Sequence, residues 1–263
     1  MNSNAVVFLA WGEKCISEVR ACIITSKTFL KNSDIILITD EYTQLDEIEK
    51  CVNKIIRINF SMSGLLRKVE IFKFLPDNYD RYLYLDSDTA VIKDISLGFT
   101  MADLHGIAVS PAPHYSLDAF WGFDKIMRLE GVPTLGQLQY NTGVIFFKNC
   151  AAVKNVFKKW ESLALKHIEF NNDQPFFTLA MYTLGFNPFT LSISYNYRGF
   201  GDAISGDIRV WHSHGQMPQR INDYTFSWPP RRAWPNRLEF PQTPDKNDLL
   251  HLIKNILIRQ FNK

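Results

Sequence analysis

The sequence has no apolar run of about eighteen residues, the length that a membrane-spanning helix needs. It also has no block of lysine or arginine, and its formal net charge of +2 does not predict binding to nucleic acid. The first residues, Met1 to Asn4, carry no positive side chain before an apolar segment, so no secretory signal is predicted. We therefore expect a cytoplasmic protein.

Cysteine is scarce as well. The four cysteines, Cys15, Cys22, Cys51 and Cys150, are scattered, and no Cys-x-x-Cys pair occurs. This spacing argues against a disulfide framework. We expect four reduced, buried thiols.

The chain does contain enough apolar material for one large core. Of its 263 residues, 46% are hydrophobic and 14% aromatic, which is far from the composition of disordered chains. We expect one globular domain at residues 1–242 and a separate tail at residues 243–263.

Apolar runs alternate with helical periodicity along this domain, which predicts an α/β fold. Strands are predicted at residues 5–10, 34–39, 54–60, 82–85, 107–110 and 141–147. Helices are predicted at residues 15–29, 65–75 and 151–165. This order is typical of a Rossmann-like, open and mostly parallel sheet that helices cover on both faces. In such sheets ligands bind at the carboxyl ends of the strands.

The apolar run Tyr82 to Leu85 leads directly to two carboxylates, Asp86 and Asp88, with Ser87 between them. Two oxygen ligands leave most of the coordination shell of Mg²⁺ or Mn²⁺ open for phosphate oxygens and water. The pair therefore predicts a metal that arrives with a phosphate-bearing substrate. The alternative is that one of the two aspartates caps the next turn.

Three later motifs follow this pair in order: Asn141-Thr142-Gly143-Val144, Asp173-Gln174, and Val210-Trp211-His212-Ser213-His214-Gly215-Gln216. Together with the segment around Asp86 and Asp88, they resemble the glycogenin-like and lipopolysaccharide galactosyltransferase-like glycosyltransferases, over about residues 5 to 216. Thr142 stands where that family has a serine. The resemblance implies the GT-A fold and transfer of a hexose from a nucleotide sugar to a glycan or glycolipid acceptor.

The resemblance also implies the ligands and their binding residues. Asp86, Asp88 and His212 are expected to hold Mn²⁺ or Mg²⁺ against the diphosphate of a UDP-hexose. The residues expected to contact the donor or its metal are Leu9, Ala10, Trp11, Lys68, Asp86, Ser87, Asp88, Asn141, Thr142, Gly143, His212 and Gly215.

Asp173 and Gln174 are the catalytic residues that the resemblance implies. Asp173 is expected to bond hydroxyls of the donor sugar, and Gln174 is expected on the face opposite the leaving diphosphate. The resemblance implies retention of the anomeric configuration, by front-face attack of the acceptor rather than through a glycosyl-enzyme. The alternative is that Asp173 or Gln174 only caps a helix that Pro175 begins.

Alternatives remain for four further residues. His214 lies at strand spacing from His212 and is a second candidate for the metal ligand. Arg67 and Lys68 also fit a solvated helix face. Trp11 either stacks on the donor base or packs on the helix that follows it.

Two other functions fit part of the pattern. A haloacid-dehalogenase-type phosphatase would use Asp86 as nucleophile and Asp88 as acid and base, but no later acidic pair is evident. A non-catalytic nucleotide-sugar-binding protein is the other alternative.

The tail, residues 243–263, has a broad apolar face at helical spacing, and the preceding segment 224–235 interleaves aromatic residues with arginines. This pattern predicts an amphipathic helix that attaches the protein peripherally to an anionic membrane surface. The alternative is that the helix packs on the domain or on a second subunit of a homo-oligomer.

Overall fold

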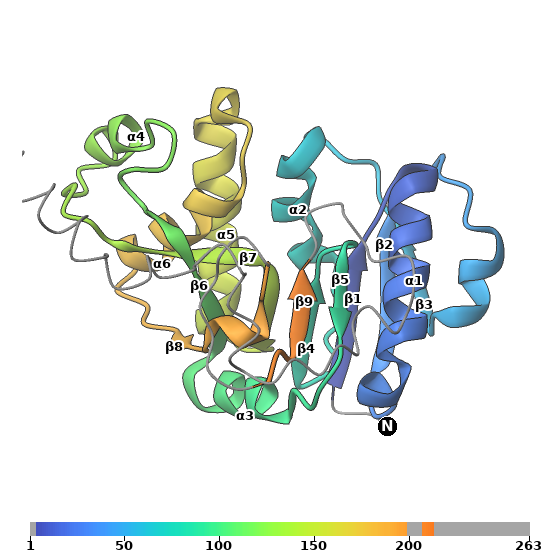
Figure 1. The fold of residues 1–263 in the computed structure, drawn as a ribbon. Helices are drawn as coiled ribbons and strands as arrows, with labels where there is room; N and C mark the ends of the chain where they lie inside the picture. The colour runs from blue at the N-terminus through green and yellow to red at the C-terminus, as the bar shows by residue number, and fades with distance from the viewer. Residues whose placement is uncertain (1–3, 199–206, 213–263) are drawn as a thin grey trace, which may run out of the picture.

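The apolar runs form the centre of a seven-stranded sheet in the computed structural model, which describes residues 4–198 and 207–212 (Figure 1). In chain order, with η for a 3₁₀ helix, the elements are β1 (Asn4–Leu9), α1 (Gly12–Leu30), β2 (Asp34–Thr39), η1 (Asp46–Cys51), β3 (Lys54–Arg57), η2 (Gly64–Leu66), α2 (Arg67–Glu70), η3 (Ile71–Phe74), β4 (Arg81–Leu85), β5 (Thr89–Val91), α3 (Ser96–His105), β6 (Ile107–Ser116), α4 (Asp124–Leu129), β7 (Leu138–Lys148), α5 (Ala151–Lys166), η4 (Ile168–Phe170), α6 (Gln174–Thr183), β8 (Phe189–Thr190), η5 (Ile193–Tyr195) and β9 (Val210–His212).

The main sheet has the strand order β3-β2-β1-β4-β7-β6-β8. Its pairs are parallel except for the two that β7 makes, with β4 and with β6. A separate antiparallel pair joins β5 to β9. The prediction of an open, mostly parallel sheet is therefore confirmed.

Each face of the sheet is covered by helices, because the inner strands are apolar on both sides. In β1, Val7 belongs to the core beneath α5 and α6, and Phe8 belongs to the core beneath α1 and α3. The inward residues of α5 include Val156 and Trp160, as its helical periodicity predicts. Two layers of helices thus leave the strand ends as the exposed edge at which a ligand can bind.

The structure differs from the sequence prediction in several elements. Residues 65–75 form two 3₁₀ helices around a single α-helical turn rather than one helix. The helices α3 and α4 have no counterpart among the predicted helices. In α3 the apolar spacing is irregular because Gly98, Phe99 and Ala102 are the buried residues, and a glycine counts against a helix in sequence reasoning.

Gly98 allows α3 to pack on the sheet, and Gly98→Ala is expected to destabilise the fold. A methyl group at this position would lie 2.5 Å from the ring of Phe146, which is fully buried. Overpacking of this kind costs about 1–3 kcal/mol, which exceeds the gain in helix propensity of about 1 kcal/mol. Urea unfolding should show a lower midpoint, whereas Leu97→Ala, at a half-exposed position on the same helix, should change it less. A higher midpoint for Gly98→Ala would contradict this packing.

The cysteine prediction is wrong for three of the four residues. All four are free thiols, but only Cys22 is buried, and Cys15, Cys51 and Cys150 are partly exposed. Burial raises the pKa of Cys22 to about 11. Cys15 lies on α1 and lines a pocket, which the spacing of the cysteines in the sequence does not show.

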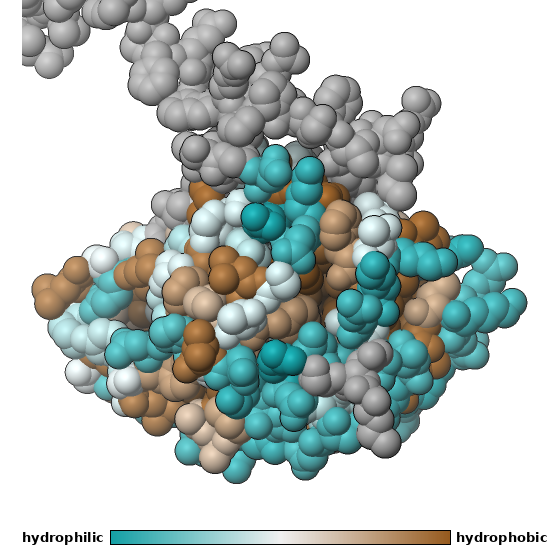
Figure 2. All heavy atoms as spheres, turned by 90° about the horizontal axis from the view of Figure 1, so that it is seen from below, coloured by the Kyte–Doolittle hydropathy of each residue, from teal (hydrophilic) through white to brown (hydrophobic). Residues whose placement is uncertain are grey.

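On the face of the molecule that Figure 2 shows, hydrophobic residues (brown) are interspersed with hydrophilic ones (teal). This is the usual surface of a globular protein. Among the described residues no helix is long and apolar enough to cross a membrane. The predicted tail helix and the segment 224–235 lie outside the described residues, so peripheral membrane attachment stays a prediction.

Candidate active site

The register of the strands brings the sequence motifs to one edge of the sheet. β1 and β4 run parallel with Phe8 opposite Leu85, so both strands end at this edge. β7 runs antiparallel to β4, and the Asp86 amide donates to the Gly143 carbonyl at 2.9 Å. β9 pairs with β5 and sets His212 opposite Thr89, one residue beyond Asp88. Motifs that are far apart in the chain thus converge on the turn after β4.

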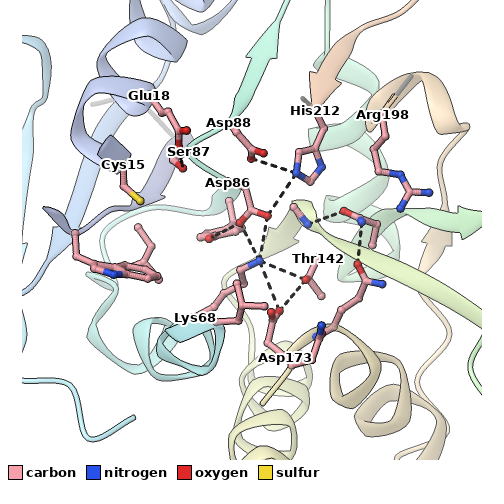
Figure 3. A pocket seen from close by; sticks show the side chains of 18 of the residues that line it. Cys15, Glu18, Lys68, Asp86, Ser87, Asp88, Thr142, Asp173, Arg198 and His212 are labelled. Carbon is pink, nitrogen blue, oxygen red and sulfur yellow. Dashed lines mark hydrogen bonds and ion pairs between the residues drawn. The ribbon is translucent and has the colours of Figure 1, made fainter. Parts of the chain in front are cut away.

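Asp86, Asp88 and His212 form a group that can hold a cation. Their ligand atoms all lie within 4.8 Å of one another. His212 Nε2 lies 3.2 Å from a carboxylate oxygen of Asp88 and 3.8 Å from one of Asp86 (Figure 3). Two carboxylates and one imidazole suit Mn²⁺ or Mg²⁺ and leave coordination positions for oxygens of a ligand. The residues therefore fit the predicted cation.

A chain of side-chain amides determines which nitrogen of His212 faces the carboxylates. The Gly143 backbone N–H donates to Asn141 Oδ1 at 2.9 Å, and a backbone N–H is always a donor, so this end of Asn141 is its oxygen. The same oxygen lies 2.7 Å from Asn196 Nδ2, which must donate. The oxygen of Asn196 then faces His212 Nδ1 at 2.8 Å, so Nδ1 carries the proton. In the neutral imidazole, His212 Nε2 then keeps the lone pair that a metal ligand needs.

The same chain reaches Gln174 in the other direction. Asn141 Nδ2 donates to Gln174 Oε1 at 2.8 Å, so the carbonyl of Gln174 is held on the Asn141 side. Asn141 and Asn196 are both buried. One rigid set of hydrogen bonds therefore connects the candidate metal ligand to the candidate catalytic glutamine.

Gly143 leaves the space that the cation group occupies. A Cβ atom at this position would lie 2.3 Å from His212 Cε1 and 2.9 Å from Asp86 Oδ2. Real Cβ contacts are never that short, so only glycine allows both ligands their observed positions. The glycine of the Asn-Thr-Gly motif is thus explained by close approach of side chains.

Lys68 is buried between two carboxylates. Its ammonium lies 2.8 Å from Asp86 Oδ1 and 3.6 Å from Asp173 Oδ2, and the residue is 7% exposed. Burial lowers the pKa of Lys68, but the charges of Asp173 and Asp86 raise it more, so the pKa lies above its ordinary value. The alternative of a solvated helix face is wrong for Lys68. Arg67 is partly exposed and pairs with Asp40 at 3.2 Å.

Asp173 is buried at the start of α6, and its side chain does not cap the helix. Its carboxylate accepts a hydrogen bond from the Thr142 hydroxyl at 2.7 Å, and the first amide of the helix bonds Asn172 instead. Burial raises the pKa of Asp173, and the charge of Lys68 offsets this only in part. For Asp173, the capping alternative does not describe the structure.

These side chains line one pocket of about 830 Å³, a size typical of small-molecule sites. Leu9 and Trp11 form part of its wall, and the Ser87 hydroxyl donates to Glu18 at 2.7 Å. Ala10 is not among the lining residues, because its side chain is buried and its amide donates to the Ile38 carbonyl at 3.0 Å. Its contact with the donor stays a prediction.

Three of the predictions are not resolved by this geometry. The Arg67 guanidinium lies over the Trp11 ring, 5.0 Å from its centroid, and Trp11 also lines the pocket. Stacking of Trp11 on the donor base therefore stays a prediction. Gly215 and the alternative ligand His214 lie outside the described residues.

No protein-family model and no curated protein sequence matches the chain. Solved structures do match it. Mouse xyloside xylosyltransferase 1 has a TM-score of 0.54 at 14% identity, covering 82% of this chain and 100% of that one. The galactosyltransferase LgtC, solved with donor and acceptor sugar analogues, has a TM-score of 0.57 at 14% identity, with 87% and 93% covered. The glycosyltransferase GlyE of Streptococcus pneumoniae TIGR4 has a TM-score of 0.53 at 16% identity, with 86% and 61% covered.

The chain has the GT-A glycosyltransferase fold. The resemblance stated from the sequence motifs is thereby confirmed at the level of the fold. In this GT-A chain Leu9, Asp86 and Asp88 lie at or just after the carboxyl ends of β1 and β4, and Asn141 to Gly143 lie on the facing end of β7, as expected for an open α/β sheet. His212 reaches this edge from β9, and Asp173 and Gln174 reach it from the start of α6.

The GT-A pocket also contains residues that sequence reasoning missed. Tyr84 belongs to an apolar run, yet its hydroxyl donates to Asp86 at 2.8 Å, and burial followed by the charge of Asp86 raises its pKa well above the ordinary value. Glu18 and Arg198 line the pocket on either side of the carboxylates (Figure 3). Asn196 is an isolated asparagine in the sequence, so no local signal identifies it.

Proposed function

We propose that the protein is a metal-dependent glycosyltransferase that moves a hexose from a UDP-hexose to a glycan or glycolipid acceptor. The observation that carries this proposal is the convergence of three sets of side chains in one pocket. They are the cation group of Asp86, Asp88 and His212, the buried ammonium of Lys68, and the Asp173-Gln174 pair. The GT-A fold supports the same reaction class.

Charge determines what each residue does in this reaction. A divalent cation held by Asp86, Asp88 and His212 would neutralise negative charge that develops on the departing diphosphate. Lys68 adds a second positive charge, which its raised pKa keeps in place at neutral pH. The same ammonium pairs with both Asp86 and Asp173 and offsets one of their two negative charges, which helps the fold to tolerate the buried carboxylate of Asp173.

The sugar end of the site uses Asp173 and Gln174. The buried carboxylate of Asp173 is held by Thr142 and stabilises positive charge on the anomeric carbon as the bond breaks. The Gln174 carbonyl accepts from Asn141 and keeps a second lone pair for the same purpose. An amide oxygen is a weak nucleophile, so we propose front-face attack by the acceptor with retention of configuration.

Release of UDP from UDP-glucose or UDP-galactose tests the proposal. The full chain with Mn²⁺ should release UDP slowly into water, and chelation of the metal should stop the release. Binding of UDP with no release from either donor would instead support a non-catalytic nucleotide-sugar-binding protein. Release of phosphate from phosphomonoesters would support the phosphatase alternative, which the GT-A fold does not favour.

Gln174→Ala is expected to lower kcat about tenfold to a hundredfold while changing the KM for the donor little. The substitution removes the carbonyl at the sugar but leaves the cation group in place. Steady-state rates at varied UDP-hexose concentration measure both constants. An equal loss in kcat and in donor affinity would indicate that Gln174 only positions the Asn141 amide.

Asn196→Ala is expected to weaken Mn²⁺ binding about tenfold to a hundredfold, because His212 loses the acceptor that fixes its tautomer. Asn196→Asp should retain only part of the affinity, since its carboxylate accepts the Nδ1 proton but can no longer donate to Asn141 Oδ1. Calorimetric titration of the full chain with Mn²⁺ measures both variants. Equal affinities in Asn196→Ala and the native protein would contradict the proposed tautomer.

A further inference from the structure

Trp121 is a large aromatic side chain placed in solvent at the pocket. It is 73% exposed, yet it lines the same pocket as Asp173 and Gln174. It follows β6, in the short connection that leads to α4. Aromatic side chains that line a pocket together with a few polar groups are typical of small-molecule sites.

The backbone of Trp121 is strained to keep this side chain in place. Its φ angle is +47°, and among the described residues only Trp121 and Asn171 have a positive φ without being glycine. Asparagine adopts this conformation readily, whereas it is an outlier for a bulky residue. Glycine would remove the strain at no steric cost. A tryptophan where glycine would fit without strain therefore indicates a use for the ring, since strain of this kind gathers at binding sites.

Phe120 makes the Trp121 ring a fixed surface. The two rings stack at a centroid distance of 5.3 Å and an angle of 10°, and Phe120 is itself only 5% exposed. Phe120 packs in turn on Phe170, at a centroid distance of 6.4 Å. Backbone hydrogen bonds from the Trp121 amide to Ala119 and from the Phe123 amide to Phe120 close the turn. Phe120 thus supports the Trp121 ring, while most of the Trp121 side chain stays exposed.

The order of the strands places Trp121 at the sugar end of the site. β1, which ends two residues before Trp11, and β6, which leads to Trp121, lie on opposite sides of β4 and β7. Asp86 follows β4 directly, and Asn141 lies on β7. Phe120, on which Trp121 stacks, packs on Phe170 in the segment that precedes Asp173. Trp121 thus lies away from the β1 edge, where the donor base is expected.

We propose that Trp121 is the platform on which a pyranose ring of the acceptor stacks. One face of a hexopyranose presents C–H groups, which pack against a flat aromatic ring, while its hydroxyls remain free to face the pocket that Trp121 lines. The acceptor is therefore a carbohydrate at its reacting end, whatever carries it. That the bound sugar acts as the acceptor rests on the proposed function, but binding of a pyranose to Trp121 can be measured without turnover.

Saturation-transfer difference NMR tests the platform directly. The full chain is mixed with UDP and Mn²⁺ and with methyl β-D-galactopyranoside, methyl α-D-glucopyranoside or lactose. We expect saturation to reach the C–H protons of one ring face in at least one of these sugars. Trp121→Ala should weaken this binding about three- to tenfold, and Trp121→Tyr should restore much of it. Leu129→Ala, which removes an equally exposed side chain that does not line the pocket, should leave it unchanged.

The outcomes separate this proposal from the proposed function. The proposal for Trp121 would be overturned if no sugar receives saturation from the protein, or if saturation transfer is equal in Trp121→Ala and the native protein, even if UDP and Mn²⁺ bind. Loss of UDP binding in Trp121→Ala, measured by calorimetry, would place Trp121 in the donor site instead. Sugar binding without any UDP binding in the native protein would support the platform and contradict the proposed donor.

The thermal midpoints of Trp121→Gly and Trp121→Ala test whether the backbone at this residue is strained. Both variants lose the stack on Phe120, but only glycine accepts the positive φ without strain, so Trp121→Gly should have the higher midpoint. A midpoint for Trp121→Gly at or below that of Trp121→Ala would contradict strain at this residue.

Discussion

Asp88→Asn is expected to abolish transfer from UDP-hexose, with a loss of at least about a hundredfold in kcat/KM. Asparagine keeps the size of the side chain but removes the charge that a divalent cation needs. The carboxylate of Asp88 lies 3.2 Å from His212 Nε2 and contributes little to the core, so the fold should persist. Initial rates with each UDP-hexose measure the loss, and circular dichroism checks the fold.

Two comparisons sharpen this result. Asp77→Asn removes a carboxylate from an exposed surface pair with Lys154 and should leave the rate nearly unchanged. His212→Ala should be as inactive as Asp88→Asn. If His212→Ala has a normal transfer rate while His214→Ala is inactive, the histidine ligand is His214. The hydrogen bond between His212 and Asn196 would then not orient a metal ligand.

Gly143→Ala is the second change with a large expected effect, here on Mn²⁺ binding. It removes none of the three candidate ligands, but it displaces two of them, His212 and Asp86. The added methyl group would overlap His212 and crowd Asp86, and Asn196 holds the histidine ring so that it cannot turn away freely. We expect Mn²⁺ affinity to fall about tenfold to a hundredfold, with a stability loss of about 1–3 kcal/mol.

A double-mutant cycle with His212→Ala tests this explanation. When the imidazole is absent, the main clash of the added methyl group disappears, so Gly143→Ala should cost less stability in the His212→Ala background than in the native one. Urea unfolding of the four proteins measures the coupling. Additive losses would show that Gly143 is required for the backbone of β7 and not for the approach of His212.

The sequence was sufficient for features that depend on local pattern. The strand at residues 34–39 follows from its apolar run, and the cation group follows from a motif order that resembles a known family. It was insufficient where a contact between distant segments of the chain determines the local structure. Residues 65–75 break into short helices, and α3 tolerates Gly98 because Phe146 fills the adjacent space.

Two parts of the candidate site depend on tertiary contacts of this kind. Asn196 matters through hydrogen bonds to Asn141 and His212, which lie on two different strands, and no periodicity indicates such partners. Trp121 is distinguished by its φ angle and exposure, neither of which a single residue type reveals. Conversely, the family motif included Ala10, although its side chain points into the core.

Thermal unfolding of the full chain with nucleotide sugars, with and without Mn²⁺, tests the central claim most directly. A ligand that binds only the native state at about a hundred times its Kd should raise the midpoint by about 5–10 °C in a chain of this size. We predict this shift for UDP-hexoses with Mn²⁺, and little or no shift without the metal or in Asp88→Asn. A shift with GDP- or CMP-sugars but not with UDP-sugars, or an equal shift with the metal chelated, would contradict a metal-dependent UDP-hexose site.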